Sequence, residues 1–499
     1  MRLRYSNFSA GLLEDARSRS IPDGFTPDAQ NVDIERDGSI TLPGRGVTRF
    51  TSSPLAAGKP VRGLWWLQRK DGTWAILAAC DNKLWRIKAS GDAESLGTLY
   101  GGVNTHYSGQ VYLGQLFICS GQGSPQVYNT ELEDLADLED VDLPPTWKAG
   151  NWPSKVTLLN AGKNERLCMF APGNDTSALW TCAYANHLAW NLDDDGYNLA
   201  PGDGDGEELI AVASFHDLVI CIKETRSFAL HNIGTDGLPE AMNLIPFGGD
   251  SQESVVSIDN ALYWSSPEGF VSLAAALEPG ADARGTFSSR RIPDALGEIS
   301  QTRRRQICGA WDHKLRRVRW FAPDLKDVTN NRVFDFYPYH RHPDHRGLTT
   351  GAWMTWKGIQ ASAVISYESA MGPIMLAGDY DGYINRVGFN HLNLGESIPA
   401  HFTLPTIELG YRGRIPIMDW LVHEGGDNLQ VETAIDSGEA KINYRTLEPT
   451  FSGETAPARA RLVNFGGGHD FQFTIRHRGG AEPGRIDGLV VEAQPLGGR

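Results

Sequence analysis

The sequence predicts an all-β protein: a β-propeller core, an extended N-terminal arm and a C-terminal antiparallel domain of β-sandwich type. Glycine (55 of 499 residues) and aromatic residues (10%) are plentiful, as in chains of many short strands joined by tight turns. A strand, a short polar turn and a more apolar second strand recur, mostly at intervals of about 35 to 50 residues. That interval is typical of propeller blades with four strands each.

The first part, residues 1–50, is polar and rich in turn-forming residues, with Ile21-Pro22-Asp23-Gly24 and Asp37-Gly38 as examples. We expect an extended arm with one short strand pair. It would close the propeller or dock on a neighbouring subunit.

The central part, residues 51–395, carries the recurring hairpins. Their corners hold Asp, Asn, Gly and His, which tolerate left-handed backbone angles or cap their own turn. The hairpins are predicted within residues 75–87, 110–119, 182–187, 212–221, 255–264, 307–314 and 374–384. Because the intervals are irregular and no WD or kelch signature occurs, an array of β-sandwiches is the alternative fold.

Two segments of this part differ from the hairpins. Residues 131–142 form an acidic connector, and residues 324–350 are polar and aromatic. We expect the longer segment to be a loop insertion that projects from the propeller.

The last part, residues 396–499, returns to alternating polar and apolar residues. Strands are expected at residues 400–404, 429–433, 471–476 and 488–491. This pattern predicts a separate antiparallel β domain with one face buried.

Charge and cysteine usage narrow the function. The net charge of −15 does not favour a protein that grips nucleic acid, which usually shows a basic stripe. The basic runs at Arg303-Arg304-Arg305 and Arg316-Arg317 are interpreted first as solvated turns or subunit contacts, and second as nucleic-acid contacts. The six cysteines form no CxxC pair, so we expect buried free thiols rather than disulfides or metal ligands.

The sequence also predicts where the protein folds. No stretch holds the ~20 apolar residues that a membrane helix requires. The basic start, Met1-Arg2-Leu3-Arg4, is not followed by the apolar segment of a secretory signal. We expect folding in a cytoplasm and no membrane partner.

Short boxes in a fixed order carry a resemblance to a known family. The arm contains Phe8-Ser9-Ala10-Gly11-Leu12, Pro22-Asp23-Gly24, Asp28-Ala29-Gln30-Asn31-Val32, Asp37-Gly38-Ser39-Ile40 and Arg45-Gly46. Later boxes are Gly249-Asp250-Ser251, Ser254-Val255-Val256, Leu262-Tyr263-Trp264 with Gly269, Gly378-Asp379-Tyr380-Asp381-Gly382-Tyr383-Ile384, Ile398-Pro399-Ala400 and Glu408-Leu409-Gly410. Together they resemble bacteriophage tail nozzle, tail-tube and head–tail stabilisation proteins.

This resemblance implies a structural rather than an enzymatic role. Members of the family have a β-propeller core and assemble as a ring, commonly a homohexamer, below the portal and adaptor. The expected partners are other copies of the chain, the adaptor and other tail proteins, and genomic DNA that passes without specific binding. The expected location is the virion tail, assembled in the host cytoplasm, with a part in genome retention and ejection.

Two clusters could bind a metal ion. His340-Arg341-His342-Pro343-Asp344-His345 offers imidazole and carboxylate ligands for zinc, but Pro343 prevents a regular helix, so a solvated or interface loop is preferred. The acidic runs at residues 193–196 and 203–208 supply hard oxygens of the kind Ca²⁺ binds. Neither follows the EF-hand pattern, and acidic turns are the preferred interpretation.

Two alternative functions depend on exposed or paired side chains. A receptor- or glycan-binding propeller at the tail tip would use an exposed aromatic patch of Tyr337, Tyr339, Trp353 and Trp356. A propeller glycosidase would need paired carboxylates, and its only trace is Asp71-Gly72-Thr73-Trp74, interpreted as a hairpin turn. We therefore expect no catalytic, cofactor-binding or metal-binding residues.

Inward strands should bury rows of aromatic residues that stiffen the disc. The residues expected there are Trp85, Phe117, Tyr184, Phe215 and Trp264.

Overall fold

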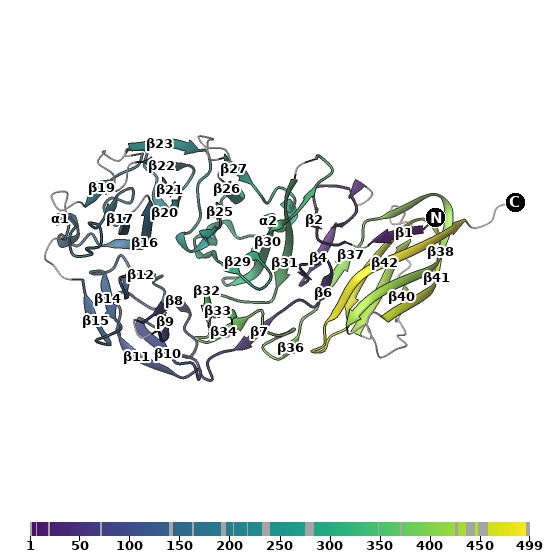
Figure 1. Ribbon diagram of the computed structural model, residues 1–499, viewed down its shortest axis with the longest axis horizontal. Helices are drawn as coiled ribbons and strands as arrows, with labels where there is room; N and C mark the ends of the chain where they lie inside the picture. The colour runs from purple at the N-terminus through teal and green to yellow at the C-terminus, as the bar shows by residue number, and fades with distance from the viewer. Residues whose placement is uncertain are drawn as a thin grey trace.

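The computed structural model contains a seven-bladed β-propeller and a separate antiparallel half-barrel (Figure 1). It describes all residues except 1, 6, 18–19, 70–71, 139–142, 162–163, 191–195, 203, 217, 232–239, 275–283, 348, 370–371, 425–427, 436–444, 448–457 and 496–499. The all-β prediction is confirmed. In the described part, no helix is long and apolar enough to cross a membrane.

Each of the first six blades is a four-stranded antiparallel sheet whose strands follow chain order. Blade 1 consists of β8 (Val61–Gln68), β9 (Trp74–Cys80), β10 (Lys83–Ile87) and β11 (Ala93–Thr98). Blade 2 consists of β12 (Ser108–Tyr112), β13 (Gln115–Cys119), β14 (Gln126–Asn129) and β15 (Asp134–Asp137). Blade 3 consists of β16 (Pro153–Ala161), β17 (Asn164–Pro172), β18 (Leu179–Thr181) and β19 (Tyr197–Leu199). Blade 4 consists of β20 (Leu209–Phe215), β21 (Leu218–Lys223), β22 (Ser227–His231) and β23 (Glu240–Ile245). Blade 5 consists of β24 (Val256–Ile258), β25 (Ala261–Ser266), β26 (Gly269–Ala274) and β27 (Arg284–Phe287). Blade 6 consists of β28 (Cys308–Asp312), β29 (Arg317–Pro323), β30 (Asn330–Pro343) and β31 (Thr349–Lys357).

The hairpin corners use left-handed backbone as predicted. Asp81 and Asn82 have φ of 51° and 50°, His216 has 53° and Asp259 has 48°. These angles let a two-residue turn follow the twist of its two strands. One predicted hairpin is wrong: residues 182–185 follow β18 as an irregular segment with a bridge between Ala183 and Asn186.

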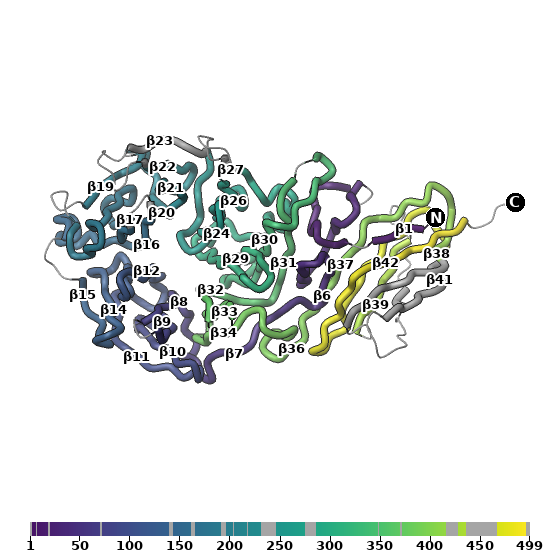
Figure 2. Tube along the Cα trace, in the orientation of Figure 1, coloured from purple at the N-terminus to yellow at the C-terminus, as the bar shows by residue number. Residues whose placement is uncertain are grey.

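The seventh blade joins the two ends of the propeller. It consists of β32 (Ala363–Ser369), β33 (Gly372–Gly378), β34 (Ile384–Val387) and then β7 (Val47–Arg49) from the arm, which pairs antiparallel with β34. The short strands β35 (Leu392–Asn393) and β36 (Glu396–Ser397) extend this sheet beyond β7. The arm therefore closes the ring of blades, and Figure 2 shows β7 beside β34.

The half-barrel is built from both ends of the chain. Its C-terminal strands are β37 (His401–Thr403), β38 (Ile407–Glu424), β39 (Leu429–Ile435), β40 (Arg445–Leu447), β41 (Ala458–His477) and β42 (Gly484–Pro495), and its arm strands are β1 (Arg2–Tyr5), β4 (Asp28–Gln30), β5 (Asp33–Ile34) and β6 (Ile40–Leu42). The predicted C-terminal antiparallel domain is thus one curved sheet. In Figure 2 the purple arm runs among the yellow-green C-terminal strands.

The arm is richer in structure than the one strand pair expected. Besides β1, β4, β5, β6 and β7 it contains a parallel pair, β2 (Gly11–Leu12) and β3 (Phe25–Thr26). Where the connections between blades are described, they contain the short helices α1 (Pro145–Lys148), η3 (Gln252–Ser254), α2 (Pro293–Gly297) and η4 (Gln301–Gln306).

The segment 324–350 corrects a prediction. It was expected as a projecting loop, but most of it is β30, which pairs with β29 and β31 in blade 6. Residues 332–338 are buried. The polar residues that suggested a loop include Arg332 and Asp335, whose charges have ion-pair partners inside the protein.

The hydrophobic core lies between the blades. A separate cluster of buried side chains fills each contact between neighbouring blades, for example Leu77 with Leu116 between blades 1 and 2. The cluster between blades 5 and 6 is the largest and continues through the arm into the half-barrel, linking Trp353, Phe8 and Phe402. The two modules therefore share one core.

Candidate functional site

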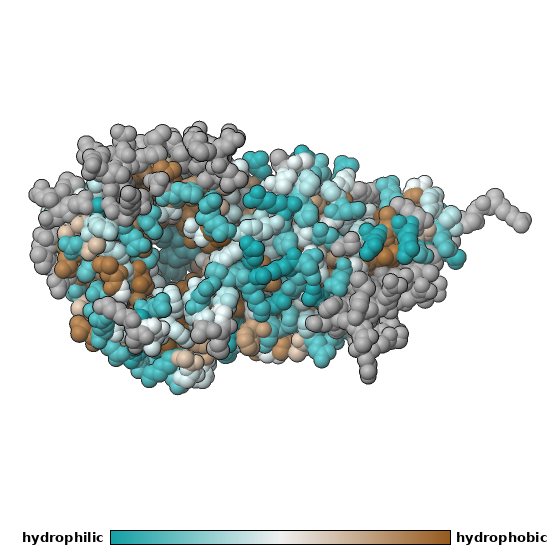
Figure 3. All heavy atoms as spheres, viewed as in Figure 1, coloured by the Kyte–Doolittle hydropathy of each residue, from teal (hydrophilic) through white to brown (hydrophobic). Residues whose placement is uncertain are grey.

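The first strands of the blades surround a central channel. β8, β12, β16 and β20 contact one another in sequence, and β28 contacts β32, which contacts β8. Figure 3 shows the disc hollowed at its centre. One end of the channel contains a cavity of about 190 Å³. Propellers and other closed β structures commonly bind ligands at such an axis.

Most polar side chains at this end of the channel are occupied in joining neighbouring blades. Ser108 Oγ accepts from Val156 N (3.2 Å), Ser362 Oγ donates to Val61 O (2.6 Å), and Gln252 binds both backbone groups of Val212 (2.8 and 3.2 Å). These bonds satisfy groups that would otherwise be unpaired at the ends of the strands.

Three ionisable residues of the cavity are outside these seams: Arg62 of β8, His106 just before β12, and Glu253 of η3. The guanidinium Nη1 of Arg62 lies 3.0 Å from His106 Nε2. Glu253 is oriented by Ser251, whose Oγ caps its backbone N–H (3.1 Å) and donates to its carboxylate (2.9 Å).

The contact fixes the protonation of His106. Arginine only donates, so His106 Nε2 accepts and the imidazole proton is on Nδ1. Burial and the charge of Arg62 lower the pKa of His106, while Glu253 acts in the opposite direction. Burial also lowers the pKa of Arg62. The guanidinium nevertheless remains charged, because an arginine pKa is far above 7.

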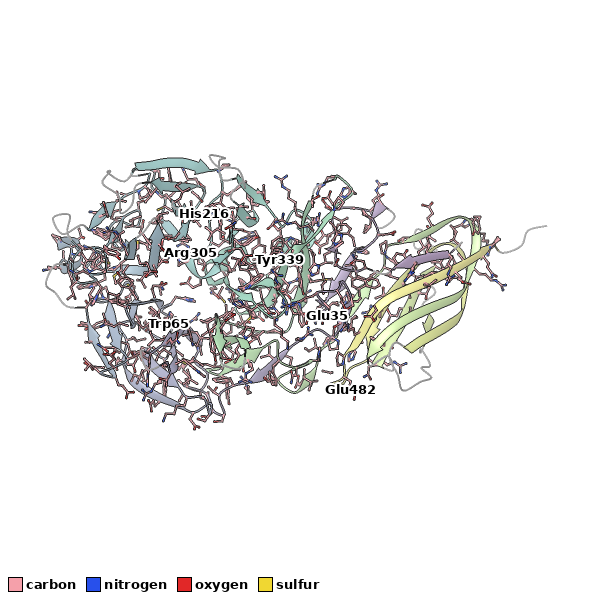
Figure 4. The ribbon with its side chains drawn as sticks, in the orientation of Figure 1. Glu35, Trp65, His216, Arg305, Tyr339 and Glu482 are labelled. Carbon is pink, nitrogen blue, oxygen red and sulfur yellow. The ribbon has the colours of Figure 1, made fainter. Side chains whose placement is uncertain are left out.

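A second set of charges lies beside the channel between blades 3, 4 and 6. Lys155 of β16 contacts Glu208 (3.5 Å), which also binds Arg305 of η4 (2.5 Å), and Arg305 reaches Glu224 (2.7 Å). Figure 4 shows Arg305 and Trp65 beside the central opening. These cations have carboxylate partners, so the set fixes blades to one another.

The joint between propeller and half-barrel is a buried ionic network. Asp33 of β5 accepts from Arg317 (2.5 Å), and Arg317 also binds Asp312 (3.0 Å) and Asp335 (2.7 Å). Arg319 holds Asp335 through two parallel bonds of 2.7 Å, the strong geometry for this pair. The Asp33, Arg317, Arg319 and Asp335 side chains are completely buried.

The pKa values in the network follow from its charges. Burial disfavours ionised Asp33, but Arg317 and Arg45 outweigh it and lower its pKa to about 2. Burial likewise opposes the charge of Arg317, and Asp33 and Asp335 outweigh it, so its pKa is raised. The arm is therefore held to blade 6 as ions.

Asn31 fixes the arm at a second point. It is fully buried with φ of 60°. Its backbone N–H donates to Thr355 O (3.0 Å), its Oδ1 accepts from Lys357 N (2.8 Å), and its Nδ2 donates to Pro399 O (2.7 Å). One side chain thus joins the arm, blade 6 and the start of the half-barrel.

Arg49 secures the closing strand β7. It donates to Asp379 (2.5 Å) and Asn385 (3.0 Å) and lies 3.7 Å above the ring of Tyr383. Asp379 also accepts from the backbone of Asp381 (3.0 Å) and of Tyr383 (2.8 Å). The turn after β33 is thereby shaped to receive the arm.

The histidine cluster is divided among different partners. His342 Nε2 lies 2.8 Å from Ser9 Oγ, Asp344 lies 3.8 Å from Arg291, and His345 lies 4.0 Å from Asp15. His340 packs edge-on against Tyr337. Across the described ranges, no three His, Cys, Asp or Glu side chains are grouped as a metal site. The cluster is part of blade 6 and its contact with the arm.

The acidic run at residues 203–208 is paired within the chain where it is described. Asp205 binds Lys223 (2.5 Å), Glu207 binds Thr225 (2.5 Å), and Glu208 binds Arg305. Residues 193–195 and Asp203 lie outside the described residues.

The basic runs match the prediction of solvated turns only in part, because Arg305 and Arg316 are exposed whereas the other three arginines are not. Arg304 is buried against Asp250 (3.3 Å), and Arg317 is in the joint. Arg303 donates to Asp327 O (2.7 Å), and Arg316 is exposed above Tyr339. The sequence shows the charges but not the carboxylates from distant segments that neutralise them.

The proposed exposed aromatic patch is wrong. Tyr337, Trp353 and Trp356 are fully buried, and only Tyr339 is exposed, at 45%. In the rows of stiffening residues, Phe117, Phe215 and Trp264 are buried as predicted, Trp85 is half-buried, and Tyr184 is 54% exposed. Alternation in a buried strand does not distinguish its two faces when both are covered.

The segment that could suggest a glycosidase, which includes Gly72 and Thr73, is a hairpin turn where it is described. Arg69 N donates to Thr73 O (2.7 Å) and Gly72 N to Arg69 O (3.0 Å) between β8 and β9. Asp71 itself lies outside the described residues. The described lining of the axial cavity includes one carboxylate, Glu253. The six cysteines are free and buried, as predicted.

An open cleft of about 470 Å³ lies between blades 2 and 3. Its walls include Tyr100, Gln122, Asp137, Lys148 and Trp152. Tyr100 is 42% exposed and donates to Asp137 (2.9 Å).

Sequence reasoning missed both the axial cavity and the joint. Arg62 and His106 are isolated charged or titratable residues, and Asp33 is one of many arm carboxylates. No motif marks them. The one available signal was that Arg62 is a charged residue within the largely apolar segment 61–67.

No family model matches the sequence, and no curated protein matches it. Among solved structures, virginiamycin B lyase from Staphylococcus aureus is 8% identical with a TM-score of 0.41, covering 68% of this chain and 98% of that chain. A streptogramin B lyase is 10% identical with a TM-score of 0.38 (69% and 97%), and a chain of the mitotic checkpoint complex is 11% identical with a TM-score of 0.40 (68% and 94%). The likeness is one of propeller fold alone.

Proposed function

We propose that the protein is a structural component of a bacteriophage tail, of the nozzle or hub kind. Copies of it would form a ring, most simply a hexamer, around the DNA channel and take part in genome retention and ejection. Its partners would be other copies, the adaptor and other tail proteins, and its location the virion tail.

One observation carries this proposal: boxes that resemble phage virion proteins meet where the chain is joined together. Asn31, from the Asp28–Val32 box, contacts Pro399 of the Ile398–Ala400 box. Arg49, just after the Arg45-Gly46 box, binds Asp379 of the Gly378–Ile384 box. The resemblance therefore includes residues that close the propeller and residues that join it to the half-barrel, as a ring-forming part requires. A ring also satisfies head-to-tail contacts without an open end.

The charges are compatible with DNA that slides past. The net charge is −15, and Arg304, Arg305 and Arg317 have carboxylate partners in the chain. A channel wall with negative charge has the same sign as the DNA phosphates and does not bind them, so it would not slow the passage of the DNA.

Cryo-electron microscopy of the virion, with the full chain carrying a gold-binding tag, tests the proposal. We expect gold at the tail in a cyclic arrangement, and a native mass of the purified assembly that is six times that of the chain. Finding the protein only as monomers outside the tail would refute it.

Glycan binding is a second candidate, favoured by the cleft between blades 2 and 3. Aromatic rings and planar amide or carboxylate groups can stack on and hydrogen-bond to sugars. The cleft offers the exposed Tyr100, the half-buried Trp152, and Gln122 and Asp137. A glycan array with the full chain and Trp152→Ala tests this, with Trp85→Ala on another blade as the matched control. Glycan binding that is lost in Trp152→Ala and kept in Trp85→Ala would favour this candidate function. An array on which the full chain binds no glycan would rule it out.

A further inference from the structure

Arg62 differs from the other arginines where inner strands begin. Arg304 and Arg305, which precede β28, have carboxylate partners. Arg62 has no ion pair with a carboxylate among the residues that the structure describes, and its Nε has no hydrogen-bond partner. Among the described residues its side-chain neighbours are the imidazole of His106, at 3.0 Å, and the phenol of Tyr380, and neither is a carboxylate. A partly buried, unpaired charge is unfavourable in the unoccupied state, so its retention indicates a ligand of opposite charge.

Part of the cavity wall is apolar, although Glu253 and the polar residues of the blade seams also line it. Leu64, Trp65, Val156 and Val364 form apolar walls. The indole of Trp65 packs against Gly109, where an added Cβ would be 2.3 Å from the ring. The volume of about 190 Å³ equals that of about six water molecules or slightly more than one aromatic ring.

We propose that the axial cavity binds a small organic anion, with a carboxylate or phosphate head on Arg62 and a compact apolar body beside Trp65. Arg62 Nε and its unbound N–H groups form the charge-assisted bonds to the head. His106 holds the guanidinium in place by accepting from Nη1.

Titration calorimetry and thermal unfolding of the full chain test the proposal with defined probes. Benzoate and phenyl phosphate combine the head and the ring, inorganic phosphate has the head alone, and benzyl alcohol has the ring alone. The variants are Arg62→Gln, which keeps a polar side chain but removes the charge, and Arg412→Gln, at an exposed arginine of the half-barrel, as the matched control.

We expect benzoate or phenyl phosphate to bind saturably and to raise the melting temperature of the wild type and of Arg412→Gln. Arg62→Gln should bind at least tenfold more weakly and, without ligand, melt no lower than the wild type. Comparing the two organic anions shows which head group is preferred.

Three outcomes would overturn the inference: neither organic anion binds, binding is unchanged in Arg62→Gln, or inorganic phosphate or benzyl alcohol binds as tightly as both. Since Arg62→Gln removes an unpaired charge, it should fold. If Arg62→Gln loses binding because it unfolds, the expectation that this variant is at least as stable as the wild type is wrong, and that result also counts against the inference.

Discussion

At the scale of single residues, the protein concentrates charge where its two modules meet. Asp33, Arg317, Arg319 and Asp335 are fully buried, and buried ions are tolerated only when each has partners of good geometry. The Asp33–Arg317 pair joins positions 284 residues apart, whereas Arg317 and Arg319 bind Asp335 within blade 6. Removing one member therefore leaves another as an isolated charge.

Replacing Arg317 by Met should lower the free energy of unfolding by about 3–5 kcal/mol, because Asp33 and Asp335 lose their shared cation. The neighbouring Arg316 is exposed, so Arg316→Met is the control and should change stability by less than about 1 kcal/mol. Urea unfolding followed by circular dichroism measures both. Equal effects in the two variants would contradict a buried joint.

The same network gives stability a pH dependence. The pKa of Asp33 is about 2 in the folded protein against an ordinary 3.8. A depressed folded pKa contributes stability that is complete above the ordinary value and is lost as pH falls from about 4 to 2, here about 2 kcal/mol. Urea unfolding at pH 6, 4 and 3 should show that the difference in free energy of unfolding between wild type and Asp33→Asn becomes smaller as the pH falls. The gap for exposed Asp23→Asn should not follow this pattern.

At the scale of elements, the closing strand β7 supplies the last strand pairing of the propeller. Val47 is buried against blades 6 and 7, whereas its neighbour Thr48 is half-buried on the other face. Successive residues of a strand point to opposite faces, which makes the two positions a matched pair.

Val47→Asp should destabilise the protein by about 3 kcal/mol, because it places a charge in an apolar cluster. Thr48→Asp should have a much smaller effect. The freed edge of β34 should also make the Val47 variant aggregate on heating, measured by light scattering. If the two variants behave alike, β7 does not close the blade in solution.

The hairpins explain why the blade repeat was hard to see in the sequence. Residues 75–87 form the second and third strands of blade 1, whereas residues 110–119 form the first and second strands of blade 2. The strongest hairpin of each blade is therefore not in the same place, so the intervals vary although the blades repeat.

At the scale of the whole molecule, propeller and half-barrel share a core. The cluster that contains Trp353 and Phe402 crosses the joint, and the arm contributes strands to both modules. Neither module is complete without residues 1–50.

Calorimetry of the full chain should therefore show one transition, with calorimetric and van't Hoff enthalpies that agree. Phe402→Ala removes a ring from the shared core, where it packs 5.6 Å from Phe8, and should shift the whole transition downward. Tyr184→Ala, at an exposed position, is the control. Two separate transitions in the wild type would show that the modules are independent.

The sequence by itself determined the β class, the hairpins and their left-handed corners, the buried thiols and the change of pattern near residue 396, because these depend on neighbours along the chain. Only the tertiary structure decided that residues 330–343 are a strand, that three of the four patch aromatics are buried, and that Arg62 is left unpaired at the axis. Those features depend on which segments the fold brings together, such as the pairing of β30 with β29 and β31 and the contact of Arg62 with His106, 44 residues away. Burial and charge neutralisation are properties of the folded neighbourhood, and no local pattern encodes them.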